Sequence, residues 1–197
     1  EVFLTSLSEC EDALVKSVEA CRLENGQYVV VVSADSIPSV LRVETDGSVR
    51  TMKGFDAFSH VSLAGAIGTD VFVLYSESEE GTITILKEDD SLVVKDYSET
   101  CGSSRIQRMY MLENGSVALA IENEKSVVVL DGELNAVPGR LQGEEGVVRS
   151  VLMYGDWYVV IRSEGKEHDV LTASFYDSEG TLVLAKELLH RAVNTME

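Results

Sequence analysis

Tight-turn sequences recur along this chain at nearly constant intervals. The first turns of four successive segments begin at Asn25, Gly68, Asn114 and Gly155, so the steps between them are 43, 46 and 41 residues. Asn-Gly is favoured in two-residue β-hairpins because both central residues of a type I′ turn need a positive φ. A fixed period of this length is typical of repeat architectures, in which one supersecondary unit is copied along the chain. The sequence therefore predicts a series of similar antiparallel β units.

Each repeat contains four short apolar runs separated by turn signals, which indicates four β-strands. The second run is nearly all apolar, as in Val29–Val32, Val71–Leu74 and Tyr158–Ile161, whereas the third and fourth runs alternate more with polar residues. A strand without alternation is covered on both faces. An inner strand buried twice and an outer strand half exposed are the profile of a β-propeller blade packed between two neighbours.

We therefore predict an all-β fold, a β-propeller with four four-stranded antiparallel blades and a half blade at the N-terminus. Residues 2–16 resemble the third and fourth strands of the second blade in order and spacing, which is why a half blade is expected there. Residues 1–188 would form the propeller or part of one, and residues 189–197 a helical tail or linker. The full blades are expected at about 17–52, 60–97, 105–138 and 147–188.

The half blade leaves an open sheet edge, which natural proteins avoid. The missing strands could come from the C-terminal tail, from another chain, or from the rest of a longer protein that carries seven or eight blades. A closed four-bladed propeller is the main competing hypothesis.

The blades resemble degenerate WD40-type or quinoprotein-type blades, a likeness of fold that covers about Val2 to Leu188. The WD40 signature is absent, because no Gly-His opens a blade and no Trp-Asp closes one. The single tryptophan, Trp157, falls on the second strand of the fourth blade, and the double glycine of kelch repeats is missing. The turns Thr45–Gly47 and Ser178–Gly180 are only loosely similar to the Asp-box of sialidase propellers. The resemblance implies binding through loops at one mouth of the channel and names no narrower family.

The charge of the chain limits its partners. With 34 acidic and 16 basic residues, the net charge is −18, which repels phosphate backbones and anionic membrane surfaces. A protein partner with a basic surface would instead be attracted and steered. No apolar run approaches the length of about 18 residues that a membrane span requires. We expect protein partners, no nucleic acid and no direct membrane insertion.

The chain has three cysteines, Cys10, Cys21 and Cys101, and a small, odd number of cysteines does not make a disulfide framework. Independent reduced thiols are expected rather than a Cys10–Cys21 bridge. Reduced thiols favour an intracellular location, cytoplasmic or nuclear. The secretory compartment stays open as an alternative. Asn114-Gly115-Ser116 matches a glycosylation sequon, but its position as a hairpin turn explains Asn-Gly without any sugar, and the match matters only in a secretory protein.

No residue pattern predicts chemistry. The histidines His60, His168 and His190 lie in no arrangement with a nucleophile, and Glu167–Asp169 alternate sides on a β-type segment, so they cannot all face one ion. The acidic turn Glu88–Asp90 lacks the spacing of a calcium loop. We expect no catalytic residue, no metal and no cofactor, and therefore no enzyme.

Candidate partner-binding residues lie in two of the loops. The segment 53–59 places two aromatic side chains, Phe55 and Phe58, beside Asp56 on an otherwise polar loop, and aromatic residues often anchor a partner. Glu144 and Glu145 are the acidic candidates of the second loop. The competing interpretation is that both rings tuck under their loop and fill a gap between blades.

The sequence favours a non-catalytic protein-interaction scaffold, a propeller portion of a larger multi-subunit assembly. The alternative is a secreted or periplasmic propeller that binds a small ligand or a glycan and could be an enzyme. That alternative needs convergent polar residues on the first strands, which would line the channel. These strands carry Cys21, Ser62, Arg105, Arg108 and Arg149. The arginines could bind an anion, although salt links between blades explain them equally well.

Overall fold

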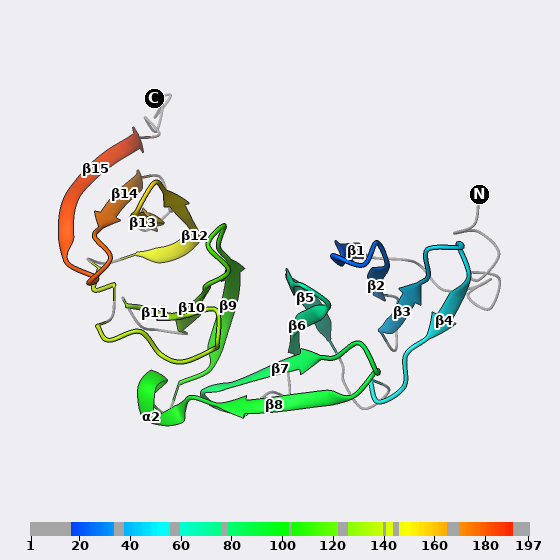
Figure 1. The fold of residues 1–197 in the computed structure, drawn as a ribbon. Helices are drawn as coiled ribbons and strands as arrows, with labels where there is room; N and C mark the ends of the chain where they lie inside the picture. Colours follow the sequence, from blue (N-terminus) through cyan, green and yellow to red (C-terminus); the bar gives the residue numbers. More distant parts are fainter. Residues whose placement is uncertain are drawn as a thin grey trace, which may run out of the picture. The chain divides into compact units, whose positions relative to one another are not determined.

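The structure is a computed structural model that describes residues 17–33, 38–55, 60–75, 79–102, 104–121, 126–139, 141–143, 146–164 and 170–190. Its contacts divide the chain into two compact units, Glu1–Ser98 and Glu99–Glu197, which are described separately. The fold is all-β, and Figure 1 shows its strands gathered into small antiparallel sheets.

The first unit contains two four-stranded antiparallel meanders with strand orders β1-β2-β3-β4 and β5-β6-β7-β8. The first sheet consists of β1 (Ser17–Arg22), β2 (Tyr28–Ser33), β3 (Ser39–Val43) and β4 (Val49–Thr51). The second consists of β5 (Val61–Ile67), β6 (Asp70–Tyr75), β7 (Thr82–Leu86) and β8 (Leu92–Asp96). Consecutive strands pair throughout, as the hairpin signals predict.

The second unit contains a three-stranded and a four-stranded antiparallel sheet, with orders β11-β10-β9 and β12-β13-β14-β15. A short helix, α2 (Ser98–Cys101), precedes them at the border of the units. The first sheet consists of β9 (Ile106–Met111), β10 (Val117–Ile121) and β11 (Val127–Leu130). The second consists of β12 (Val147–Tyr154), β13 (Trp157–Glu164), β14 (Val170–Tyr176) and β15 (Leu182–His190).

The third sheet differs from the prediction, because the expected fourth strand over 135–137 is not a strand. Ala136 makes only an isolated bridge to Leu130, and Leu141 makes another to Val127. The turn before Ala136 has Leu134 at φ 64°, much as the turn before β8 has Asp90 at φ 67°, so the two segments differ only after the turn. The chain leaves the sheet edge within a few residues, so the ladder cannot propagate.

Two other predictions concern the ends of the chain. Strand β15 extends to His190, two residues into the segment predicted as a tail. The predicted half blade over residues 2–16 and the rest of the tail lie outside the described residues.

The core of each unit lies between its two sheets. In the first unit, Val29, Val31 and Val40 pack with Val71 and Val73 of the facing sheet. In the second unit, the side chains that pack together come from β10, β11 and β12–β14, and they include Ala118, Ala120, Val129, Val151, Tyr158, Val160 and Tyr176. In each unit the two sheets therefore stack face to face. Alternate residues of the second strand make the contact, on β2 in the first unit and on β10 in the second.

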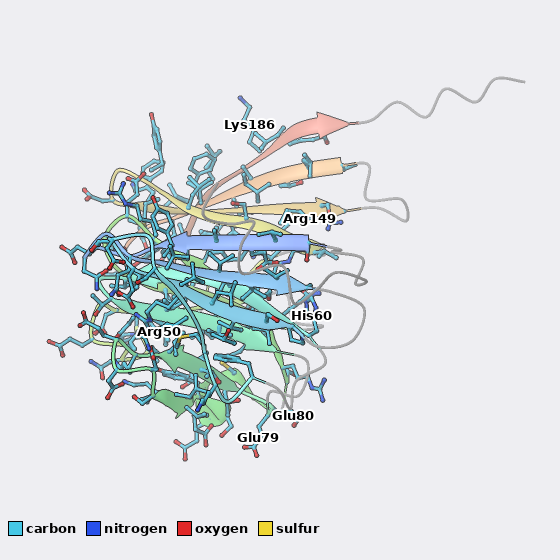
Figure 2. All side chains as sticks on the ribbon, turned by 90° about the vertical axis from the view of Figure 1, so that its right-hand side faces the viewer. Arg50, His60, Glu79, Glu80, Arg149 and Lys186 are labelled. Carbon is cyan, nitrogen blue, oxygen red and sulfur yellow. The ribbon has the colours of Figure 1, made fainter. Side chains whose placement is uncertain are left out.

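A buried arginine links the two sheets of the first unit through polar contacts. The guanidinium of Arg42 donates to the carbonyl of Lys87 at 2.8 Å and to Gln27 Oε1 at 3.2 Å, and pairs with Asp90 at 3.1 Å. Arg50 also pairs with Asp90, from a more exposed position. Arg50 lies at the turn end of the strands, whereas His60, Glu79 and Glu80 lie at the opposite end (Figure 2).

The turn between the third and fourth strands repeats one stabilising device. An aspartate carboxylate accepts a hydrogen bond from a backbone N–H two residues later, which is an Asx turn. Asp46 accepts from Ser48 at 2.9 Å, and Asp89 accepts from both the N–H and the hydroxyl of Ser91, at 3.0 and 2.6 Å. These turns explain why acidic residues recur at this place without any ligand.

The aspartate turns predict a pH dependence of stability. Hydrogen bonds from Ser48, the backbone N–H first, lower the pKa of Asp46, and hydrogen bonds from Ser91, the hydroxyl first, lower the pKa of Asp89. A carboxyl whose pKa is lower in the folded state stabilises the fold above its unfolded pKa of about 3.9 and loses that contribution as the pH falls further. In urea titrations between about pH 6 and about pH 3, the double variant Asp46→Asn/Asp89→Asn should lose less stability than the natural chain, because Asn Oδ1 still accepts but does not titrate. Equal acid sensitivity of the two proteins would contradict this assignment.

Candidate functional site

The structure corrects one candidate site residue and leaves four untested. Phe55 is only 1% exposed and packs with Val29, Val61 and Val71 in the core of the first unit. Its ring therefore fills the space between two sheets, and it cannot anchor a partner. The other candidates, which are Asp56, Phe58, Glu144 and Glu145, lie outside the described residues.

The loop that contains Glu144 and Glu145 starts from a fixed position. Arg162 is buried, and its Nη1 donates to Tyr176 Oη at 3.2 Å, while Tyr176 donates to the carbonyl of Gln142 at 2.7 Å. Gly143 lies so close to the guanidinium of Arg162 that a Cβ there would overlap it. A side chain at this place would therefore have to displace the buried Arg162 guanidinium, so packing favours glycine at position 143.

An exposed apolar surface lies on the face of sheet β12–β15 that points away from the core of the second unit. Strand β13 is apolar on both sides. Tyr158 and Val160 point into the core, so Val159 and Ile161 point the other way. The register continues this second row with Leu152 on β12 and with Phe175 and Leu184 on β14 and β15. We call this surface the open face, made of Leu152, Tyr154, Trp157, Val159, Ile161, Ala173, Phe175, Leu184 and Leu188.

The open face is exposed and slightly hollowed. Leu184 is 49% exposed, and Leu152, Tyr154 and Leu188 are exposed as well. Seven side chains, from Leu152, Tyr154, Val159, Ile161, Ala173, Phe175 and Leu188, line an open hollow of about 400 Å³. Contiguous exposed apolar surface of this kind marks an interaction site in soluble proteins.

An aromatic pair stands at the turn end of the open face. Trp157 packs edge to face against Phe175, with ring centroids 6.1 Å apart and planes at 79°. Trp157 keeps 39% of its surface exposed. Tryptophan and tyrosine are the side chains that most often dominate binding energy at protein interfaces.

The charges on and around the open face are sparse. Lys186 is exposed on β15 opposite Ala173 in the register, and its side chain projects away from the sheet in Figure 2. Arg149 lies at the far end, where its Nε donates to Ser163 Oγ at 2.7 Å. Arg149 is therefore engaged within its own sheet rather than held ready for an anion.

Sequence analysis missed the open face because it treated every second strand as covered on both sides. A signal was present in the outermost strand of the fourth blade, where Leu182-Val183-Leu184 is apolar, whereas β4 reads Val49-Arg50-Thr51. An apolar outermost strand is unusual for a solvent-facing position and indicates a covered one.

Reactive groups are not gathered in the part of the chain that the structure describes. Among these residues, no group of three His, Cys, Asp or Glu side chains could hold a metal ion. Neither Cys21 nor Cys101 forms a disulfide among the described residues, and burial raises the pKa of the Cys21 thiol, which keeps it protonated. Cys10, the other half of the bridge considered above, lies outside the described residues. None of the helices that the structure describes is long and apolar enough to cross a membrane.

The chain matches known proteins in structure and not in sequence. No protein-family model matches it, and no curated protein matches its sequence. It is similar to a chain of the mitotic checkpoint complex (TM-score 0.57, 13% identity, 87% of this chain and 54% of that chain). It is also similar to virginiamycin B lyase from Staphylococcus aureus (0.56, 10%, 93% and 58%). A further match is a eukaryotic initiation factor (0.59, 10%, 89% and 44%).

These similarities, together with the meandering sheets, confirm the expected fold class. The matched structures have WD40-like or other propeller-type folds, and the identities are too low to indicate more than fold. The chain spans about half the length of the solved chains it resembles. The chain is an all-β protein of propeller-type blades.

Proposed function

We propose that this chain is a non-catalytic protein-interaction scaffold, a propeller portion of a larger multi-subunit assembly, and that a partner docks on the open face. The observation that supports this proposal is the exposed apolar surface centred on Phe175 and Leu184. Burying one leucine or phenylalanine side chain contributes roughly 1.5–3 kcal/mol. A partner that covered Leu152, Leu184 and Trp157 would therefore gain substantial binding free energy.

The nature of the open face favours a protein over a small ligand or a glycan. A sugar site needs several polar groups that converge in one cavity, and the hollow is lined by seven side chains of which only Tyr154 carries a polar group. The acidic chain as a whole would be steered toward a partner with a basic surface. Cys21 and Cys101 form no disulfide among the described residues, which supports an intracellular assembly.

The proposed docking can be tested by Leu184→Glu. In the isolated chain this change should alter the free energy of unfolding by no more than about 0.5 kcal/mol, because Leu184 is half exposed. In the native assembly it should weaken association roughly a hundredfold, because an unpaired carboxylate would be buried. The measurement is the fraction of tagged protein that co-elutes with its natural partners in size-exclusion chromatography at decreasing concentration.

The matched control is Val94→Glu, on β8 of the first unit. Val94 is 57% exposed, so the same charge is added to another exposed apolar position. This variant should stay in the assembly. If Leu184→Glu co-elutes as well as Val94→Glu, the open face is not the docking surface; if the natural protein elutes alone, the scaffold proposal fails.

Trp157 provides a second readout, since it is the only tryptophan of the chain. In the free chain its exposed ring should be quenched readily by acrylamide. In the assembly, quenching of this one residue should fall severalfold and its emission should shift to the blue. Unchanged quenching in the intact assembly would show that the turn end of the open face stays in water.

A further inference from the structure

The open face corresponds to a sheet face that is covered in each of the two sheet pairs that the structure describes. The register aligns Cys21, Val29 and Arg42 of the first sheet with the row that crosses the open face at Leu152, Val159 and Phe175. The next row aligns Val31 and Val40 with Ile161 and Ala173. In the first sheet, Val29, Val31 and Val40 pack with side chains of β5–β8 and are buried, and Arg42 is buried as well.

The second unit repeats this arrangement. On the three-stranded sheet, Ala118 and Ala120 occupy the β10 positions that correspond to Val29 and Val31, and they pack against the β12–β15 sheet. In both pairs, one face of a sheet is covered by the sheet that follows it in the chain. The open face is the same face of β12–β15, and no described sheet of the second unit covers it.

We propose that the open face is completed by a four-stranded, propeller-type sheet of a partner protein, seated as β5–β8 is seated on β1–β4, with a carboxylate of the partner opposite Lys186. The assignment of the covering sheet to a partner protein rests on the proposed function. An aliphatic sheet face fits because both described sheet pairs are joined by aliphatic and aromatic side chains.

The carboxylate follows from the position of Lys186. Lys186 occupies the position on the fourth sheet that Met52 occupies on the first. Lys186 lies opposite Ala173 in the register, and Met52 lies opposite Val40, whose carbonyl accepts the Met52 N–H at 2.7 Å. Met52 is only 3% exposed, because the facing sheet covers it. A lysine at the same place would be buried by the partner, and a buried ammonium needs an opposite charge.

The same alignment shows how the partner differs from β5–β8. The first sheet presents Arg42 and Arg50 to the acidic turn at Asp90, whereas Phe175 and Leu184 stand at the corresponding positions of the open face. An acidic turn placed there would meet two apolar side chains. The partner should therefore be apolar opposite Phe175 and acidic only opposite Lys186.

A second copy of this chain does not meet these requirements. The face of its β5–β8 sheet that would dock on the open face is already covered by β1–β4, through Val61, Val71 and Val73. Its Asp90 is also the residue that would be brought over Phe175. Two copies joined by their open faces would bring Lys186 onto an apolar surface, and no described carboxylate lies in the hollow.

The test uses two cross-links in the natural protein purified with its assembly. A photoreactive amino acid at Leu152 reports which polypeptide covers the open face, with the same group at Val94 as the control. A carbodiimide joins an amine to a carboxylate only in direct contact, so Lys186 should form a zero-length cross-link. We expect both cross-links to reach one other polypeptide, in segments with alternating apolar residues, and the carbodiimide product to contain Asp or Glu.

Variants of Lys186 separate its charge from its size. Lys186→Arg should abolish the carbodiimide product and keep the affinity within about threefold, since the guanidinium still pairs with a carboxylate. Lys186→Met, the residue of the first sheet, should weaken association about a hundredfold, because the partner's carboxylate is left buried and unpaired. Equal affinity of the Met variant would overturn the carboxylate.

The outcomes distinguish this inference from the proposed function. An intact assembly whose Leu152 cross-links reach a helical segment, a second copy, a distant part of the same polypeptide or nothing would overturn the inference and leave the scaffold standing. A natural protein that sediments alone and gives no cross-link at any position would overturn both.

Discussion

Arg42→Ala should lower the free energy of unfolding by roughly 3 kcal/mol, which is a large part of the stability of a domain this size. Arg42 is among the largest fully buried side chains, and its loss would leave a cavity between two sheets. It would also remove the donor that satisfies the carbonyl of Lys87 and one of the two cations that face Asp90. Urea unfolding followed by far-ultraviolet circular dichroism measures the effect.

Arg50→Ala is the matched control for this prediction. Arg50 pairs with the same carboxylate of Asp90, but its side chain is 45% exposed. Exposed ion pairs contribute about 0–1 kcal/mol, because water screens them and holding both side chains costs entropy. If Arg50→Ala and Arg42→Ala are equally destabilising, charge rather than burial governs this contact, and the assignment of Arg42 as the link between the sheets is wrong.

Gly81→Ala should destabilise the first unit by about 3 kcal/mol. Gly81 has φ 68°, and a Cβ there would lie 2.6 Å from Ser98 Cα and 2.7 Å from Ser98 N. These are backbone atoms that cannot rotate away. The carbonyl of Gly81 also accepts the N–H of Tyr97 at 2.8 Å, so any shift strains the contact between β7 and the segment that leads into α2.

Gly68→Ala, in the same unit, separates the cost of the positive φ from the cost of the overlap with the backbone. Gly68 has nearly the same dihedral angle, φ 62°, but an added Cβ would meet nothing closer than Glu24 Oε2 at 3.6 Å. We expect it to cost only about 1 kcal/mol, the conformational penalty alone. Equal costs at Gly81 and Gly68, measured from urea midpoints with unchanged slopes, would mean that Ser98 moves aside freely.

The strands were predictable because their signals are local. The turn at Asn25-Gly26 needs no distant residue to fold back, because the Gly26 N–H donates to the Leu23 carbonyl at 3.0 Å. Gly26 has φ 86°, but Asn25 lacks the positive φ of the expected type I′ turn. The apolar run over 82–86 became β7 with the expected bounds, and the run over 147–154 became β12. Periodicity and turn chemistry act within one hairpin, so they can be read before any tertiary contact is known.

The errors and omissions share a dependence on tertiary contacts. The segment 135–137 has the composition of a strand, but its position beside β11 is limited to one bridge at Ala136. Helix α2 follows from the place where Ser98 meets Gly81 and from the Asp96 carboxylate that accepts the N–H of Ser98 at 2.7 Å. The contact of Asp96 with Ser98 is local, but the approach of Ser98 to Gly81 is a tertiary contact that the sequence does not reveal.

Phe55 shows the same limit at the candidate site. An aromatic residue in a polar loop is compatible with a partner anchor or with a buried plug, and only the position of the facing sheet decides between them. The open face was not predicted because its residues look buried in the sequence, whereas Phe55 looked exposed. Val159 and Ile161 look like a strand covered on both sides, and only the structure shows that one side lacks a cover.

The amino-acid sequence by itself determined the repeat, the antiparallel meanders and the all-β class, because hairpin turns and strand alternation are set by neighbouring residues. The tertiary structure decided which apolar side chains are buried, where Arg42 and Phe55 lie, and which face of β12–β15 is uncovered. Burial depends on which sheet lies against which, and that arrangement joins residues far apart in the chain that carry no mark of one another.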